Sequence, residues 1–278
     1  MILSTFDRPR ELALVLAGYA RQDDPDFEVV VADDGSGQAT AAVVAAAAGA
    51  GPHPIRHVWH PDRGFRKTEI LNRATQRSGG EYLIFSDGDC IPRQDFVSTH
   101  RRLAARGRFL SGGYVRLPPA LSGELGPGDV ADGWIWRVGA LRSRGLKDAR
   151  SRLRMLGPGS LPGLLDRVTP TRATWNGMNS STFKEALVAV NGFELDLGYG
   201  GEDRELGARL ENLGLRGLQV RHRAVLLHLE HERPYRDAAL VTRQRALLAP
   251  LRASGRTRAV RGLAEVPDVS TTPPWEDA

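Results

Sequence analysis

Tyr82-Leu83-Ile84-Phe85-Ser86-Asp87-Gly88-Asp89 is the stretch of this sequence that best indicates its fold. The apolar run at its start predicts a buried β-strand, and two aspartates follow that strand directly. With only a glycine between them, both carboxylates can approach one divalent cation. In open α/β sheets, ligands bind beyond the carboxyl ends of the strands. The stretch therefore predicts a ligand site at the end of this strand.

Residues 1–110 alternate between strand and helix patterns around that stretch. Besides the strand at 82–85, the patterns predict strands at 1–4, 27–32 and 55–59 and helices from Pro9, at 40–48 and at 68–77. Such alternation predicts an α/β fold with a mostly parallel central sheet and helices on both faces. Asp33 and Asp34 would then end a neighbouring strand at the same edge of the sheet.

The remaining sequence divides into three parts. Residues 111–174 are rich in Gly, Pro and Arg and are interpreted as an insertion or lid with one or two helices, whereas 175–263 form a second ordered half. Residues 264–278 are expected to be a disordered tail. In the second half we predict helices at 182–190, 204–213 and 237–253 and strands at 217–221 and 224–229.

Composition limits the class of protein. The chain has 278 residues, 41% of them hydrophobic, with one cysteine and no apolar run of the roughly 18 residues that span a bilayer. We expect a soluble cytoplasmic protein. The formal net charge of +5 comes mainly from arginine and favours anionic partners, but no nucleic-acid-binding motif is present. The basic stretch 137–154 fits either a solvated helix face or peripheral contact with an anionic acceptor or membrane.

The aspartates of the opening stretch do not fit an EF-hand. Counted from Asp87, the positions that need glycine and glutamate hold Pro92 and Ser98. His228 and His231 follow another apolar run and could complete a metal shell, although their spacing of three excludes the zinc-protease motif. Mixed carboxylate and imidazole ligands favour Mn²⁺ over Mg²⁺.

Gly200-Gly201-Glu202-Asp203 precedes an amphipathic helix pattern and supplies a candidate general base. The positive end of the helix dipole would keep an aspartate ionised there, as a base requires. A glycosidase would need two acting carboxylates. A transferase with a diphosphate leaving group needs one base, because a metal ion can neutralise the departing charge.

Gly35-Ser36-Gly37 is superficially similar to a dinucleotide-binding loop. Thr40 occupies the position of the third glycine, and two aspartates precede the loop where they would repel a pyrophosphate. Asp33 and Asp34 instead suit hydrogen bonds to a base or ribose.

Two groups of motifs follow one another along the chain. The first is Ser4-Thr5-Phe6-Asp7-Arg8-Pro9, Val31-Ala32-Asp33-Asp34-Gly35-Ser36, Arg63-Gly64-Phe65-Arg66-Lys67 and the opening stretch, and the second is Asn176-Gly177-Met178-Asn179-Ser180, Val190-Asn191-Gly192-Phe193, Gly198-Tyr199-Gly200-Gly201-Glu202-Asp203 and the histidines. The first group resembles the family 2 glycosyltransferases of GT-A fold, and the second resembles the β-1,4-galactosyltransferases and chondroitin-polymerase-like enzymes. Together the motifs cover about half of the chain in the order found in the family.

The resemblance implies a role for each site residue. It implies that Asp203 is the catalytic base and that Glu202 positions the acceptor. Asp34 would contact uracil, while Asp89 would bind the metal and Asp87 the ribose or metal. The donor site would include Ser4, Phe6, Asp34, Arg66, Lys67 and Asp87, with Arg66 and Lys67 at the phosphates; the metal site would include Asp87, Asp89, His228 and His231, with His228 either a direct ligand or behind one.

The sequence thus predicts a metal-dependent inverting glycosyltransferase, either a hexosyl- or an N-acetylhexosaminyltransferase. It would use Mn²⁺ or Mg²⁺ and move a sugar from a UDP-sugar to a hydroxyl of a glycan, glycolipid or small molecule. Two alternatives remain at this point. One is a sugar-1-phosphate nucleotidyltransferase, although no glycine-rich triphosphate loop is present near the N-terminus. The other is a non-catalytic sugar-nucleotide sensor or scaffold.

Overall fold

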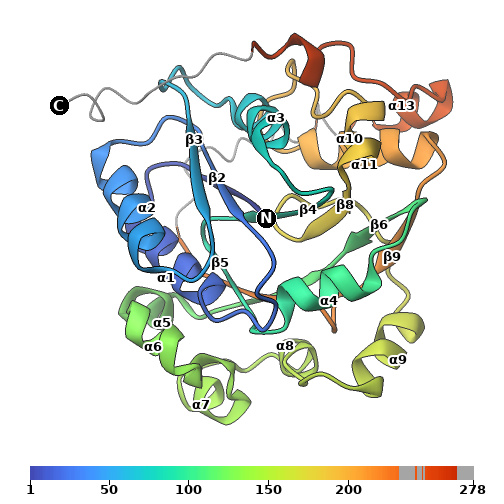
Figure 1. Ribbon diagram of the computed structural model, residues 1–278. Coiled ribbons are helices and arrows are strands. Elements are labelled where there is room, and N and C mark those ends of the chain that lie inside the picture. The colour runs from blue at the N-terminus through green and yellow to red at the C-terminus, as the bar shows by residue number, and fades with distance from the viewer. Residues whose placement is uncertain (232–241, 243–245, 247, 268–278) are drawn as a thin grey trace.

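Seven strands form a central sheet in the order β3-β2-β1-β4-β8-β6-β9 in the computed structural model, which describes residues 1–231, 242, 246 and 248–267 (Figure 1). All neighbouring pairs are parallel except the two that involve β8, which runs antiparallel to β4 and β6. The predicted α/β class with a mostly parallel sheet is confirmed. The strands are β1 (Ile2–Thr5), β2 (Val29–Asp33), β3 (Ile55–Trp59), β4 (Tyr82–Asp87), β6 (Arg108–Ser111), β8 (Ser180–Phe183) and β9 (Arg216–Gln219).

Helices cover both faces of this sheet, which explains the apolar run of β2, whereas β8, also an inner strand, is the largely polar segment Ser-Ser-Thr-Phe. Val29 and Val31 of β2 belong to a core shared with α1 (Pro9–Tyr19) and α2 (Gln38–Ala50). Their neighbour Val30 belongs to a separate core on the opposite face. Side chains alternate between faces along a strand, so a strand buried on both sides needs an unbroken apolar run. The helices of the second core are α3 (Lys67–Arg77), α10 (Lys184–Ala189) and α11 (Glu202–Asn212).

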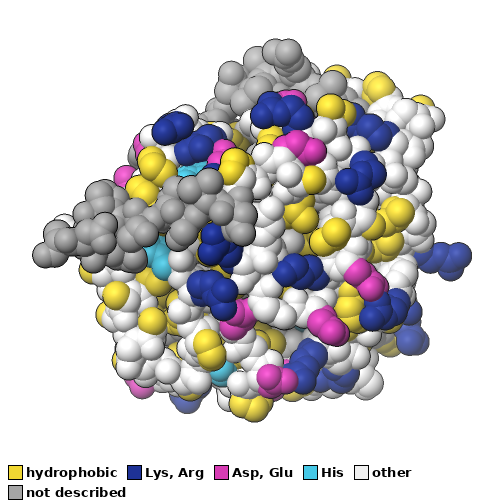
Figure 2. Space-filling model, turned by 45° about the horizontal axis from the view of Figure 1, so that its top comes forward, with side chains coloured by type: hydrophobic (Ala, Val, Ile, Leu, Met, Phe, Trp, Pro, Cys, Tyr) yellow, Lys and Arg dark blue, Asp and Glu magenta, His cyan; other side chains and the backbone are white. Residues whose placement is uncertain are grey.

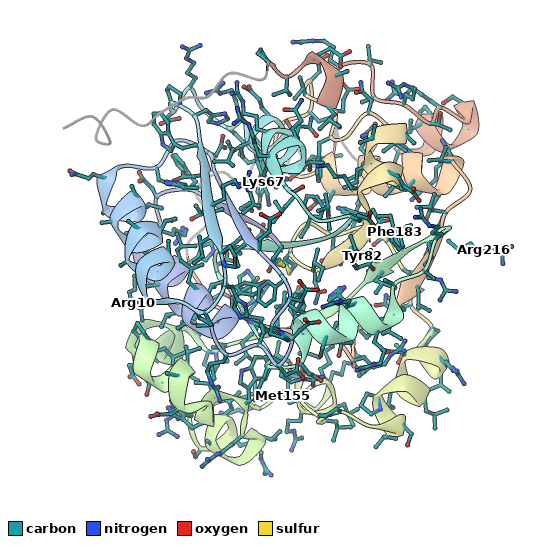
Figure 3. All side chains as sticks on the ribbon, in the orientation of Figure 1. Arg10, Lys67, Tyr82, Met155, Phe183 and Arg216 are labelled. Carbon is teal, nitrogen blue, oxygen red and sulfur yellow. The ribbon has the colours of Figure 1, made fainter. Side chains whose placement is uncertain are left out.

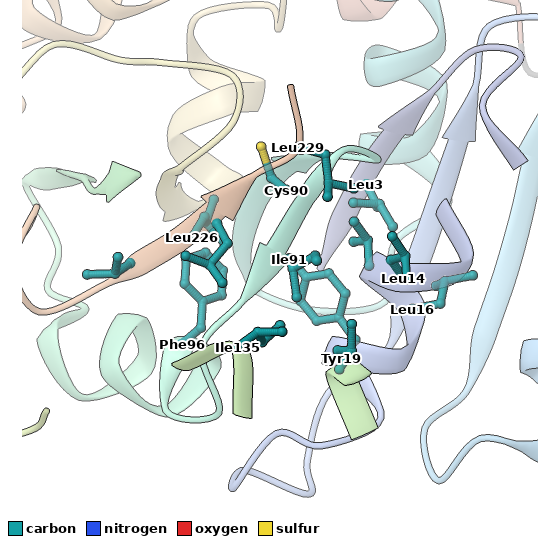
Figure 4. Close-up of a cluster of buried hydrophobic side chains, with 14 of the residues drawn as sticks. Leu3, Leu14, Leu16, Tyr19, Cys90, Ile91, Phe96, Ile135, Leu226 and Leu229 are labelled. Carbon is teal, nitrogen blue, oxygen red and sulfur yellow. The ribbon is translucent and has the colours of Figure 1, made fainter. Parts of the chain in front are cut away.

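A small second sheet brings the two halves of the chain together at one place. It consists of β5 (Cys90–Pro92), β10 (Val225–His228) and β7 (Gly113–Arg116), with β10 in the middle. The antiparallel register of β10 with β5 pairs His228 with Cys90, the residue after Asp89. Apolar side chains of β5 and β10 pack beneath this sheet (Figure 4). The predicted aspartate and histidine therefore meet through strand pairing.

The segment 111–174 contains more helices than the one or two that we predicted. After β7 it forms short helices, most of six residues, which lack the length for a clear periodic pattern. Left-handed glycines end some of them, as Gly133 does at φ 72°. These helices are α5 (Pro119–Glu124), α6 (Pro127–Asp132), η1 (Trp134–Trp136), α7 (Val138–Ser143), α8 (Ala149–Arg154) and α9 (Ser160–Val168); the chain also holds α4 (Phe96–Leu103), which we did not predict.

Two other predictions need correction. Thr182 and Phe183 are not helical, because they belong to β8 and pair with β4, so tertiary pairing overrides local preference there. The tail does not become disordered at 264, since Gln76 Nε2 donates to the carbonyls of Leu263 and Val266 around η2 (Leu263–Glu265). Residues 268–278 and most of the predicted terminal helix lie outside the described residues, apart from its end in α13 (Leu248–Ser254).

A reciprocal pair of hydrogen bonds fixes the second half of the chain to α3. Asn72 Nδ2 donates to the carbonyl of Phe193, and the amide of Phe193 donates to Asn72 Oδ1, each over 2.8 Å. Gly192 makes this approach possible, because it has φ +63° and a Cβ there would lie 2.3 Å from Asn72 Oδ1. Within the described residues, no helix is long and apolar enough to cross a membrane.

Candidate active site

A cavity of about 520 Å³ lies at the carboxyl ends of β1 and β4, and most of the predicted site residues line it. Residues from both halves of the chain line it. All the predicted site residues except Arg66 are among its lining residues: Ser4, Phe6, Asp34, Lys67, Asp87, Asp89, Glu202, Asp203, His228 and His231. The structure therefore brings together the three groups of residues that the sequence singled out.

Asp34 lies at one end of the cavity with its carboxylate held in a fixed plane. His60 Nε2 donates to Asp34 Oδ1 over 2.7 Å, and the backbone amide of Arg66 donates to Asp34 Oδ2 over 3.0 Å. His60 itself is buried. A carboxylate has about four acceptor positions, so this one can still accept an N–H of a ligand.

Asp33 and the Arg66 guanidinium have other partners. Asp33 is fully buried outside the cavity lining, where it accepts hydrogen bonds from His57 Nε2 and from the Ser36 amide. Alternation along β2 turns it away from Asp34, so the structure does not support base or ribose contact by Asp33. The Arg66 guanidinium lies against Glu69 and the Pro61 carbonyl. Its predicted phosphate contact stays untested.

Lys67, at the start of α3, forms the cationic centre of the cavity (Figure 3). Its Nζ lies 2.7 Å from Asp87 Oδ1, and Ser4 Oγ donates to the same oxygen over 2.6 Å. Burial alone would lower the pKa of Lys67, but the charges of Asp87, Asp203 and Glu202 outweigh it and raise that pKa above its ordinary value. Lys67 is therefore a permanent cation, suited to phosphate oxygens.

Asp89 and the two histidines form the candidate metal centre. Asp89 Oδ2 lies 2.6 Å from His231 Nε2 and 3.7 Å from His228 Nε2. Burial tends to raise the pKa of Asp89, but the hydrogen bond from His231 and the charge of His228 outweigh it and hold that pKa well below its ordinary value. Carboxylate and imidazole atoms converge here as a divalent cation requires, so the residues fit one.

The Cys90 thiol lies on the other side of Asp89. Its Sγ donates to Asp89 Oδ1 over 3.1 Å, and Asp89, Cys90 and His228 offer ligand atoms within 4.8 Å of one another. The thiol is buried, and burial raises its pKa well above the ordinary value. A protonated thiol is a poor metal ligand. Asp89, His228 and His231 line the cavity and Cys90 does not, so the ligand atoms that face the cavity are oxygen and nitrogen.

Glu202 shapes the loop in which the candidate base lies. Its Oε2 accepts the backbone amides of Gly200 and Gly201, each over 2.8 Å, at the start of α11. Glu202 is buried, and this pair of bonds stabilises the turn before the helix. The structure thus gives Glu202 a role in positioning the loop, and acceptor contact stays a prediction.

Asp203 has the properties of a general base. Its Oδ1 is shielded from solvent and has no hydrogen-bond partner among the described residues. Burial raises the pKa of Asp203 to about 7, Glu202 adds to this shift, and Lys67 opposes it. Burial therefore outweighs the helix dipole that we expected to keep this aspartate ionised. Gly177 faces the carboxylate, and a Cβ there would lie 2.6 Å from Asp203 Oδ1. A side chain with such a pKa can exchange protons near neutral pH.

Several lining residues had no predicted donor, metal or base role, although the resemblance implies that one of them, Tyr199, stacks on an acceptor sugar. Arg8 and Arg204 add two guanidinium groups to the cavity. Phe65 and Tyr199 form an edge-to-face pair with ring centroids 5.7 Å apart. Each of the four lies next to a predicted residue or within a quoted motif, so closeness to a motif in sequence was the available indication.

Two family models match the chain. Residues 1–116 match glycosyl transferase family 2, and residues 170–232 match a model described as the N-terminal domain of galactosyltransferase. The chain is a glycosyltransferase, and its residues 1–116 carry the family 2 match. The galactosyltransferase-like match contains the loop of Asp203 and both histidines. Among curated proteins, no sequence matches this glycosyltransferase.

Solved structures share its fold at low identity. A mannosyltransferase from Pyrobaculum calidifontis in complex with GDP-Man and Mn²⁺ is 18% identical at a TM-score of 0.57, covering 91% of this chain and 72% of that one. The structure of S. aureus TarS 1-349 in complex with UDP-GlcNAc is 15% identical at a TM-score of 0.59, and the match covers 91% of this chain and 68% of that one. Glucosyl-3-phosphoglycerate synthase from Mycobacterium tuberculosis, in complex with Mn²⁺, UDP and phosphoglyceric acid, is 17% identical at a TM-score of 0.50. The match covers 91% of this chain and 78% of that one. The chain spans 36% of the longer TarS structure.

Proposed function

We propose that this glycosyltransferase moves a sugar from a UDP-sugar to a hydroxyl group with inversion at the anomeric carbon. The observation that carries the proposal is the placement of Asp203 in the same cavity as Lys67 and Asp89. A base, a phosphate-binding cation and a candidate metal centre are the three components that a displacement of diphosphate needs.

In the proposed reaction, the acceptor hydroxyl gives its proton to Asp203 while its oxygen forms a bond to the anomeric carbon. The bond from that carbon to the diphosphate oxygen breaks, and its electron pair leaves with UDP. Because one oxygen replaces the other from the opposite side, the configuration inverts. Lys67 binds the departing diphosphate. Asp89 and His231 would hold a divalent cation, with His228 beside them, and such an ion would offset the charge of the diphosphate.

The donor base is proposed from the environment of Asp34. Both of its oxygens already accept one hydrogen bond, from His60 and from the amide of Arg66. Uracil offers a single ring N–H, whereas guanine offers two adjacent donors that suit a carboxylate with both oxygens open. The solved relatives include complexes with GDP-Man and with UDP-GlcNAc, so fold similarity does not select the base.

A panel of sugar nucleotides tests the function directly. We expect the purified protein to release UDP from at least one UDP-sugar in the presence of Mn²⁺ and a hydroxyl acceptor, with little release from GDP-sugars. NMR of the product should show the anomeric configuration opposite to that of the donor. Retained configuration, GDP-sugar preference, or formation of a sugar nucleotide from a nucleoside triphosphate would contradict the proposal.

His60→Ala should weaken UDP binding on the order of tenfold, because Asp34 loses the hydrogen bond that fixes its plane. His57→Ala is the matched control, since His57 makes the equivalent bond to Asp33, away from the cavity. Calorimetric titration with UDP measures both variants, and His60→Gln should restore part of the affinity. Equal losses in the two alanine variants would assign His60 a role in stability alone.

A further inference from the structure

Residues 133–172, the part of the chain that holds α7 to α9, carry an unusual excess of positive charge. This segment contains nine arginine and lysine residues and two aspartates, a formal net charge of +7 compared with +5 for the whole chain. One of the aspartates, Asp166, is buried against His222 and Arg223. The segment therefore presents almost exclusively cations to its surroundings.

An apolar stripe lies within the same segment, on α9. Leu161, Leu164 and Val168 are 52%, 55% and 63% exposed, and their spacing of three and four residues places them on one face of the helix. Leu153 on α8 is 47% exposed. These four are half of the eight large hydrophobic residues that are exposed in the described part of the chain. Such a cluster marks an interaction surface.

The cations and the stripe lie along one side of the molecule. Figure 1 shows α7, α8 and α9 along its lower edge, away from α3 and α10. Exposed Arg142, Lys147, Arg150 and Arg167 make no ion pair with a described residue. The face in Figure 2 differs, because cationic side chains there are interspersed with acidic ones. We call α7 to α9 with these side chains the basic apolar face.

We propose that the basic apolar face docks on a membrane that contains anionic lipids. Leucine and valine side chains of α9 would enter the boundary between headgroups and acyl chains, while the arginines contact the phosphates. A soluble polyanion would pair with the arginine and lysine side chains but would leave the apolar stripe of α9 exposed to water. A second copy of this chain would place cations against cations. An anionic bilayer complements both properties, and this proposal does not depend on the proposed reaction.

Vesicle cosedimentation of the full chain tests the proposal without any donor sugar. We expect binding to phosphatidylcholine vesicles that contain phosphatidylglycerol, weak binding to phosphatidylcholine alone, and release as salt is raised. The pairs Leu161→Ser with Leu164→Ser and Arg142→Gln with Arg150→Gln should each lower partitioning on the order of tenfold.

Matched pairs control for the loss of any apolar or cationic side chain. Val188→Ser with Leu213→Ser removes exposed apolar residues elsewhere, and Arg108→Gln with Arg216→Gln removes neighbouring exposed cations on β6 and β9. Figure 3 shows Arg216 projecting away from α7 to α9. For both control pairs, partitioning onto the anionic vesicles should stay within twofold of that of the unaltered protein. Circular dichroism checks that every variant is folded.

Three results would overturn the proposal. The first is failure of the unaltered protein to bind anionic vesicles. The second is a loss in the control pairs as large as that in the test pairs. The third is a dimer in light scattering that the Leu161→Ser and Leu164→Ser pair converts to a monomer without changing vesicle binding. If the unaltered protein bound soluble polyphosphate but not anionic vesicles, the proposal would likewise be overturned.

Discussion

Asp203→Asn is expected to abolish sugar transfer while UDP and Mn²⁺ binding persist. The amide keeps the shape of the side chain, but it cannot take the proton of the acceptor hydroxyl. Loss of a general base typically lowers kcat by about 10²- to 10⁴-fold. UDP release measured at saturating donor gives kcat, and calorimetric titration of the same preparation gives both affinities.

Asp203→Glu is the companion variant for this prediction. It keeps the charge but moves the carboxylate by one methylene within a crowded loop, where Gly177 already approaches it closely. Its activity should also fall steeply, because a base must lie within hydrogen-bond reach of the proton that it removes. Transfer at more than about a tenth of the normal rate by Asp203→Asn would disprove the assignment of the base.

The pH dependence follows from the same residue. Burial raises the pKa of Asp203 to about 7, so kcat/KM should rise as pH increases through about 7 and the base becomes ionised. Stability changes in the opposite sense. Because the folded pKa lies above the ordinary aspartate value of 3.8, the folded protein retains a proton that the unfolded chain releases, and the free energy of unfolding falls between about pH 4 and 7. Asp203→Asn should therefore raise Tm more at pH 8 than at pH 4.

The first half of the fold could be predicted because its patterns are local. The strand at 82–87 is an apolar run that leads into aspartates, and a similar apolar run forms β2, which pairs with its neighbour β1. Burial on both faces produces such runs, and parallel order then places the acidic ends at one edge. The predicted aspartates of the first half lie at that edge of the sheet.

The second half was harder to predict because its structure depends on distant partners. Thr182 follows no strand pattern of its own and becomes part of β8 through its register with β4. The short helices between 119 and 168 are each too brief for a clear period. His60 was not predicted for a similar reason. Its role depends on the 2.7 Å hydrogen bond to Asp34, which lies 26 residues away in the sequence. The helix pattern after Gly200-Gly201 singled out Glu202 and Asp203, and the resemblance to known families then indicated Asp203 as the base.

Asp89→Asn and His231→Ala are each expected to weaken Mn²⁺ binding about a hundredfold and to reduce transfer accordingly. Asp89 Oδ2 and His231 Nε2 are hydrogen-bonded over 2.6 Å at the cavity wall, so one ion could reach both atoms. Removing either leaves the ion with one protein ligand fewer, and the asparagine also removes a negative charge. Water proton relaxation with Mn²⁺ measures the affinity without any need for turnover.

Cys90→Ala separates the two possible ligand sets of this centre. A set of carboxylate and imidazole suits Mn²⁺, whereas a set that includes the thiolate suits Zn²⁺. Cys90 is buried and lines no part of the cavity, so its loss removes only the hydrogen bond to Asp89 and should lower Mn²⁺ affinity by no more than about tenfold. If Cys90→Ala instead lost the ion while His231→Ala kept it, the sulfur would be the ligand and Mn²⁺ the wrong metal. Because His228 Nε2 lies 3.7 Å from the same carboxylate oxygen, an intermediate loss in His228→Ala would make it the second imidazole of the shell.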